Sequence, residues 1–231
     1  MSRPSSVSGL YERNKQNSGV RGMKQITFVT SRLTQIPLLV LLISITLPSE
    51  AADGETSLGG SFVLGSDYTF RGVSQTVGDY STQASVDIGH SSGLYAYAWG
   101  SNVDFVPKGE PDDGARYELD LALGYSAELG DDWRVDIELI RYMFPGTIEN
   151  VDYDYSEMMA TLWFSEKYSA TAAFSNDVDG VGAASRFYEL GGNFDLPAEM
   201  TLQIKYGYYD LKRAYGSTYS YTTATLSRSI G

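Results

Sequence analysis

Residues 66–76 read S-D-Y-T-F-R-G-V-S-Q-T and end the first strongly patterned segment of the chain. Up to this point, apolar and polar side chains alternate. The apolar set is Leu58, Phe62, Leu64, Tyr68 and Phe70, and the polar set is Ser57, Ser61, Asp67, Thr69 and Arg71. A period of two is typical of a β-strand with one apolar and one wet face. The pattern therefore predicts a strand over residues 56–71, with a turn from Gly72 onward.

The same alternation recurs to the C-terminus and predicts ten strands. They cover residues 56–71, 80–90, 93–105, 116–128, 132–143, 153–165, 167–176, 185–195, 199–210 and 218–229. Most are close to the ~9–11 residues with which a tilted strand crosses a bilayer. The connections alternate in length, with long ones at 72–79, 106–115, 145–152, 177–184 and 211–217 and short ones at 91–92, 130–131, 166 and 196–198. Outer-membrane barrels have short turns at one end and longer loops at the other. The alternation therefore favours an all-β, antiparallel, up-and-down transmembrane barrel.

Three stretches also resemble a known family. They are S-D-Y-x-F-R-G-x-S-Q at 66–75, H-S-S-G-L-Y-A-Y-A-W-G-S-N-V-D-F at 90–105 and E-L-D-L-A-L-G-Y at 118–125. These motifs are similar to those of the TorF porin family of proteobacterial outer membranes, and the similarity covers residues 56 to the end. The resemblance implies a barrel fold and an outer-membrane location. It implies no particular substrate and no catalytic residues.

Charge is distributed unevenly along the 231 residues. Six Lys/Arg and two Asp/Glu give residues 1–51 a charge of +4, whereas 11 and 27 give residues 52–231 a charge of −16. Because nucleic-acid binders are usually basic, this balance disfavours nucleic acid as a partner. The absence of Cys excludes disulfides and thiolate-bound metals. With a single histidine, His90, there is little scope for a catalytic triad or a zinc site.

The N-terminal part has the organisation of an export signal. Residues 1–22 are polar and are interpreted as an extension before a better start at Met23. Lys24 and Arg32 are followed by a mainly apolar run at 36–47 and by small residues around position 50. This order predicts a secretory signal peptide over 23–51 and an outer-membrane barrel over 52–231. The alternative is a membrane anchor, but the apolar run is shorter than the ~20 residues of a spanning helix.

The predicted strands assign one face to lipid and the other to the barrel interior. The segment 116–128 places Leu119, Leu121 and Leu123 outward and Glu118 and Asp120 inward. Aromatic side chains then fall at the two headgroup levels, where amphipathic rings prefer to lie. The predicted belts are Tyr68, Phe70, Tyr80, Tyr117, Tyr206 and Tyr208 near the long loops and Tyr95, Tyr97, Tyr125, Trp133, Tyr168 and Phe194 near the short turns.

The predicted interior is rich in charge. The inward residues, which we interpret as a pore lining, are Arg71, Asp87, Arg116, Glu118, Asp120, Arg134, Asp136, Glu138, Glu157, Glu189 and Lys205. Unpaired charges would be very costly in a dry core, so this density indicates either a wet pore or a plugged interior with paired charges. Paired carboxylates such as Glu118 and Asp120 could serve acid–base chemistry. The strand period alone explains them, however, and we expect neither an enzyme nor a bound cofactor or metal.

These patterns predict a passive channel in a bacterial outer membrane, for small solutes or ions and with a preference for cations. The alternatives are a non-conducting structural or adhesive barrel and a soluble ligand-binding barrel. The chain ends at 229–231 without the terminal aromatic expected of such barrels. We therefore expect a chain cut from a twelve-stranded barrel, whose segments 56–71 and 218–229 are unpaired or forced together.

Overall fold

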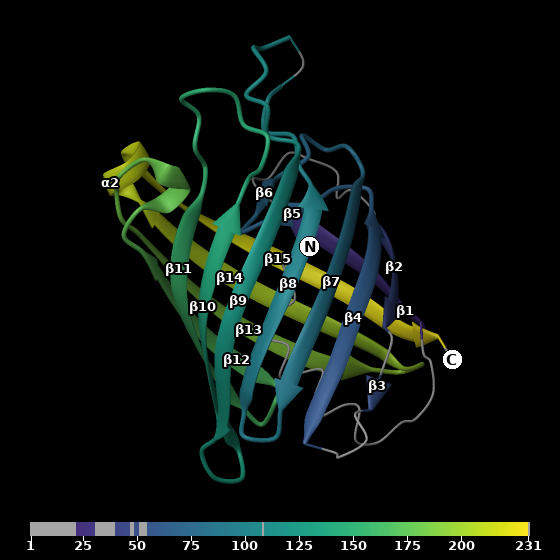
Figure 1. Cartoon of the computed structure of the whole chain (residues 1–231). Helices are drawn as coiled ribbons and strands as arrows, with labels where there is room; N and C mark the ends of the chain where they lie inside the picture. Colours follow the sequence, from purple (N-terminus) through teal and green to yellow (C-terminus); the bar gives the residue numbers. More distant parts are fainter. Residues whose placement is uncertain (1–21, 31–39, 47–48, 51–54, 108, 231) are drawn as a thin grey trace.

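The computed structural model describes residues 22–30, 40–46, 49–50, 55–107 and 109–230. It shows one large antiparallel sheet that curves into a barrel (Figure 1). Ten strands follow one another around the sheet, each paired with the next. They are β4 (Thr56–Gly65), β7 (Ser81–His90), β8 (Leu94–Asn102), β9 (Tyr117–Glu128), β10 (Trp133–Met143), β11 (Tyr155–Phe164), β12 (Tyr168–Ser175), β13 (Ser185–Leu196), β14 (Met200–Leu211) and β15 (Ser217–Ile230). The predicted all-antiparallel fold is confirmed.

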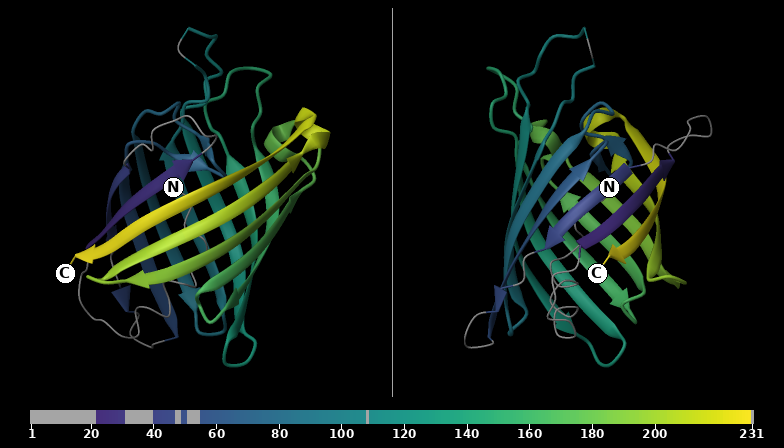
Figure 2. Two further views of the ribbon diagram at one scale, coloured as in Figure 1. Left: turned by 180° about the vertical axis from the view of Figure 1, so that it is seen from behind. Right: turned by 90° about the vertical axis from the view of Figure 1, so that its right-hand side faces the viewer.

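Three more strands come from the N-terminal part of the chain. β1 (Gly22–Thr30) pairs with β15 and with β2 (Val40–Thr46), and β2 pairs with β4. In Figure 2, β1 (purple) lies beside β15 (yellow), and β2 follows on the other side of β1. β3 (Ser49–Glu50) pairs with the start of β4. The segments 56–71 and 218–229 are thus neither unpaired nor joined to each other, because β1 and β2 lie between them. β1–β3 fall almost wholly within residues 23–51, and the secretory signal proposed for this segment stays a prediction. Residues 1–21 of the predicted N-terminal extension lie outside the described residues.

Burial follows the predicted alternation along the main strands. On β9, Leu121 is 47% exposed and the neighbouring Asp120 is 1% exposed. β11 also follows the expected assignment, with Met158 and Leu162 exposed and Glu157 and Thr161 buried. Apolar side chains thus cover the outside, and the inside holds many charged side chains together with a cluster of buried aromatic ones. None of the helices in the described residues is long and apolar enough to cross a membrane.

The outward position of Leu121 and the inward position of Asp120 lead to a first prediction. Leu121→Arg is expected to destabilise the protein by about 2–4 kcal/mol, the cost of an arginine on the lipid face near the midplane. Asp120→Asn, one residue away but inward, is expected to cost much less. Equilibrium unfolding of both variants in lipid measures the difference. Equal stabilities would show that the two faces are assigned wrongly.

The long and short connections lie at opposite ends, as expected. The segment between β8 and β9 and the one between β10 and β11 extend at the same end as α2 (Lys212–Tyr215) and η1 (Val178–Gly180) (Figure 1). At the other end the turns are tight. The three residues between the paired Leu196 and Met200 form one of them, with Ala198 and Glu199 at positive φ values of 63° and 57°.

The first connection departs from the prediction. β4 ends at Gly65, and residues 66–76 turn into the barrel as a small hairpin, β5 (Thr69–Phe70) and β6 (Val73–Ser74). Tyr68 is only 1% exposed and packs on the Trp99 ring at 5.3 Å, so its place in the outer aromatic belt was wrong. Once the chain leaves the sheet, a period of two no longer reports which side faces lipid.

Candidate functional site in the barrel interior

Arg71, at the tip of this inward hairpin, is held by the opposite wall. Its guanidinium donates to both carboxylate oxygens of Glu157 on β11, at 2.9 and 2.5 Å. The two side chains are 5% and 0% exposed. The same guanidinium lies 3.9 Å from the ring centre of Phe187 and 4.6 Å from that of Tyr209. A bidentate ion pair over aromatic faces is among the strongest polar contacts available to arginine. The hairpin is therefore fixed across the lumen.

A second hydrogen-bond network joins β8 to β10 across the inner face of β9. Tyr95 on β8 reaches over β9 and donates its hydroxyl toward Asp136 and Glu138 of β10, with 2.7 Å to Glu138. The ring can lie there because position 124 on β9 is glycine, where a Cβ would overlap the tyrosine ring. Asp136 also faces Arg134 at 3.5 Å. Arg134 in turn donates to Glu166 at the short-turn end, at 2.8 Å.

A similar tyrosine–glycine arrangement joins β15 to β13. Tyr221 on β15 passes over Gly207 of β14 and donates to Glu189 of β13 at 2.6 Å. Lys205 donates to the other oxygen of the same carboxylate at 2.9 Å. Each of the two tyrosines thus links strands that are not neighbours and satisfies an inward carboxylate.

The structure places most of the predicted lining residues inside the barrel. Buried, inward positions are occupied by Asp87, Glu118, Asp120, Arg134, Asp136, Glu138, Glu157 and Lys205, and Glu189 is part-buried beside them. Arg71 is also inside, although it comes from the hairpin rather than from a wall strand. Their role as a pore lining stays a prediction.

Arg116 departs from its predicted inward position. It immediately precedes β9 and is exposed at the long-loop end, where it bonds Asp112 at 2.5 Å and lies 3.9 Å from Asp104. The alternation was extended one residue beyond the strand, into a segment where it no longer reports a face.

Sequence reasoning missed the tyrosines of the interior. Tyr95 and Tyr97 were expected in the outer belt, but Tyr95 is 5% exposed and Tyr97 packs against the interior aromatic cluster. The signal that could have revealed Tyr95 is Gly124, because an isolated glycine inside a strand pattern suggests a close approach by another group.

Two carboxylates of the acidic loop 106–115 are engaged in hydrogen bonds. Asp112 accepts from the Gly114 backbone N–H, and Asp113 accepts from the Ala115 backbone N–H and from the Tyr153 hydroxyl at 3.0 Å. Burial, and then this hydrogen bond, raise the pKa of Tyr153 above its usual value. The hydroxyl therefore stays protonated at neutral pH and continues to donate, which joins this loop to the next one.

The sequence of residues 49–229 matches the model of a family described as bacterial protein of unknown function (Gcw_chp). The chain belongs to this family. Among curated proteins, none matches the sequence.

Several solved structures are similar to the chain. The KdgM porin in complex with disordered oligogalacturonate is 7% identical, with a TM-score of 0.45 over 92% of this chain and 99% of that one. Outer membrane phospholipase A from Escherichia coli is 9% identical, with a TM-score of 0.48 over 92% and 96%. LpxR from Salmonella typhimurium is 8% identical, with a TM-score of 0.47 over 90% and 99%. At these identities the likeness concerns the fold alone.

Proposed function

We propose that the chain is an outer-membrane channel through which small ions or solutes diffuse passively, with a preference for cations. The observation that carries the proposal is the inverted distribution of side chains, with apolar groups outside and charged groups inside a sheet that curves into a barrel. Apolar side chains on the outside are stable against the hydrocarbon of a bilayer. Charged side chains on the inside must be hydrated or paired with opposite charges. The resemblance of residues 66–75 and 90–105 to TorF porins supports the same proposal.

We expect the inward hairpin to form the constriction of the proposed channel. Its contacts extend from Trp99 on β8 to Glu157 on β11 and to Tyr221 on β15, which lies against Gly72. Residues 66–76 therefore restrict the size of a permeating solute, and Arg71 with Glu157 forms the charged part of the constriction.

Cation preference follows from the interior charges. Among the side chains that the structure describes, seven inward carboxylates are accompanied by three inward cations, Arg71, Arg134 and Lys205, because Arg116 belongs to the loops. Walls of one predominant sign concentrate counter-ions, and carboxylate rings favour cations. Across a KCl gradient, the reversal potential is expected to have the sign of a cation-selective pore. Selectivity should weaken toward ~1 M salt, where the Debye length is about 3 Å.

Variants locate the source of the selectivity. Glu118→Gln/Asp120→Asn is expected to lower the preference, since both side chains are buried inside. Asp112→Asn, which removes an exposed loop carboxylate, serves as the matched control. An anion-selective current in the unmodified protein would refute the cation preference.

A non-conducting barrel is the second candidate. The observation that favours it is the pairing of interior charges, above all Arg71 with Glu157 and Lys205 with Glu189. Planar-bilayer recording of the refolded protein separates the two functions, because a plugged barrel gives no discrete conductance steps.

Export through residues 23–51 belongs to the same proposal. The mature protein is expected to begin near Ala52, and N-terminal sequencing of membrane-extracted protein measures this directly. An intact 23–51 segment in the mature chain would show that β1–β3 are permanent parts of the sheet and not of a removed signal.

A further inference from the structure

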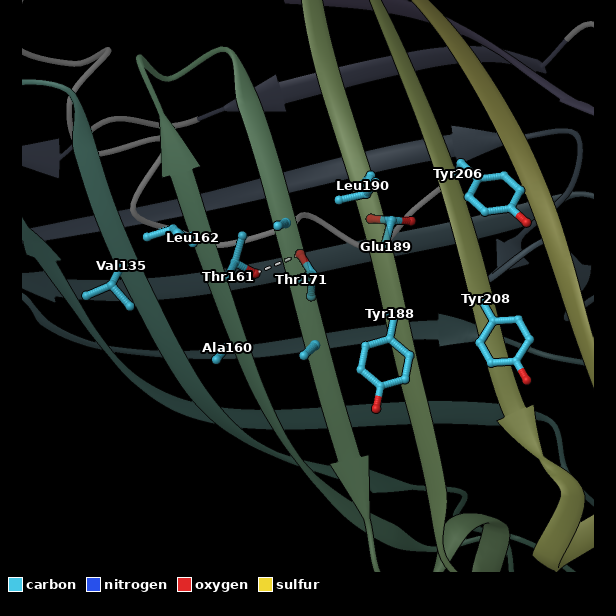
Figure 3. Close-up of a pocket in the computed structure, with 12 residues that line it drawn as sticks. Val135, Ala160, Thr161, Leu162, Thr171, Tyr188, Glu189, Leu190, Tyr206 and Tyr208 are labelled. Atoms are coloured by element: carbon cyan, nitrogen blue, oxygen red, sulfur yellow. Dashed lines mark hydrogen bonds between the residues drawn. The ribbon is translucent and has the colours of Figure 1, made fainter.

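The outer surface of β10–β14 contains a hollow of about 440 Å³. Its centre consists of three exposed alanines, Ala160, Ala170 and Ala172, where neighbouring positions carry larger groups. The surrounding outward side chains include Val135, Leu162, Tyr188, Leu190, Tyr206 and Tyr208 (Figure 3). The inward Thr161, Thr171 and Glu189 also border the hollow. Because most of the other lining side chains, including the three alanines, are exposed on the outer face, we infer that the hollow opens toward the bilayer.

The strand register fixes what borders the hollow. Tyr188 of β13 pairs with Tyr208 of β14, and on the other side with Ala172 of β12. One outward position nearer the long-loop end, Arg186 pairs with Asp210. A cationic position, an aromatic pair and an apolar hollow therefore follow in that order from the long-loop end toward the middle of the sheet.

Further basic residues extend the cationic border. Lys212 and Arg213 on α2 follow directly after β14 and are exposed, and neither forms an ion pair with a described residue. The counter-charges nearby are Asp210, at 4.0 Å from Arg186, and Asp179, which accepts from the Tyr215 hydroxyl. Asp210 also accepts from the Lys212 backbone N–H at 3.0 Å. Both of these carboxylates are therefore already hydrogen-bonded, beside three basic residues.

We propose that this border and hollow bind a phosphorylated acyl lipid of the surrounding bilayer. The phosphate is placed against Arg186, Lys212 and Arg213, and an acyl chain fills the space over the alanines. Basic groups attract anionic headgroups, and tyrosines favour the headgroup level between the two regions. The inference rests on the proposed membrane location but not on conduction.

Lipid retention measured by native mass spectrometry tests the site. The refolded full chain is titrated in micelles with phosphatidylglycerol or with zwitterionic phosphatidylcholine. Arg186→Gln/Lys212→Gln/Arg213→Gln is expected to weaken phosphatidylglycerol binding by about 100-fold, since each basic residue near an anionic headgroup contributes roughly fivefold. Phosphatidylcholine binding should change little. Arg116→Gln/Arg141→Gln removes two exposed arginines elsewhere and is the control.

A second variant tests the hollow. Ala170→Leu/Ala172→Leu fills it and is expected to reduce retention of both lipids, with folding checked by circular dichroism. Unchanged phosphatidylglycerol binding in the triple variant would overturn the proposal. Loss of a dimer peak, without loss of lipid, would also overturn it and identify the face as an interface between copies. If the protein binds lipid but gives no conductance, the lipid site is supported and the channel proposal is refuted.

Discussion

Glu157→Gln is expected to destabilise the protein by about 3–5 kcal/mol, the cost of leaving one member of a buried ion pair without its partner. The Arg71 guanidinium would remain among Phe187, Tyr209 and Tyr142 with no carboxylate to balance it. The hairpin 66–76 then loses its attachment to β11. We therefore also expect a larger and noisier single-channel conductance than in the unmodified protein.

Two comparisons make this result specific. Arg141→Gln breaks an exposed ion pair with Asp154 and should cost less than about 1 kcal/mol. Arg71→Met/Glu157→Leu removes both charges and should recover most of the stability, because apolar replacement of a buried pair is often nearly neutral. Urea unfolding in lipid and bilayer recording measure the two effects. If Glu157→Gln behaves like Arg141→Gln in both, the constriction is assigned wrongly.

Gly124→Ala is expected to cost about 1–3 kcal/mol, the usual penalty for overpacking a filled interior. Gly124 is not in the left-handed region, so the backbone itself accepts alanine. The penalty arises because the new methyl group would overlap the Tyr95 ring and displace its hydroxyl from Asp136 and Glu138.

A double-mutant cycle separates this clash from other causes. In a Tyr95→Ala background the methyl group meets no ring, and Gly124→Ala should then be nearly neutral. The coupling between the two positions is expected to exceed about 0.5 kcal/mol, as for residues in direct contact. Additive effects of the two substitutions would contradict the crossing of β9 by Tyr95.

The period of two was enough to predict the ten strands from β4 to β15 and most inward charges. Glu118, Asp120 and Glu138 are each flanked by exposed apolar or aromatic residues, and only one strand register satisfies such a pattern. It failed where both faces are apolar. On β8, Leu94 is 52% exposed and Tyr95 is 5% exposed, and nothing in their hydropathy distinguishes them. The partners of Tyr95 lie on another strand, so only the register brings them together.

Two other features could not be predicted from local pattern. The inward hairpin is stabilised by Glu157, 86 residues away from Arg71, and a long-range pair leaves no periodic trace. The strands β1 and β2 were also unforeseen. The apolar run at 36–47 is typical of the core of an export signal, but a membrane-spanning strand has a similar composition. Composition alone therefore does not distinguish a signal peptide from a strand.

The two tyrosines that cross a neighbouring strand restrict how this sequence can evolve. A larger residue at position 124 or 207 becomes acceptable only after Tyr95 or Tyr221 has been lost. Losing the tyrosine first leaves Glu138 or Glu189 without a hydroxyl donor. Each single step is therefore unfavourable, while the paired change is much less so. In diverged relatives, positions 95 and 124 should change together, as should 207 and 221, although neither pair is adjacent in sequence.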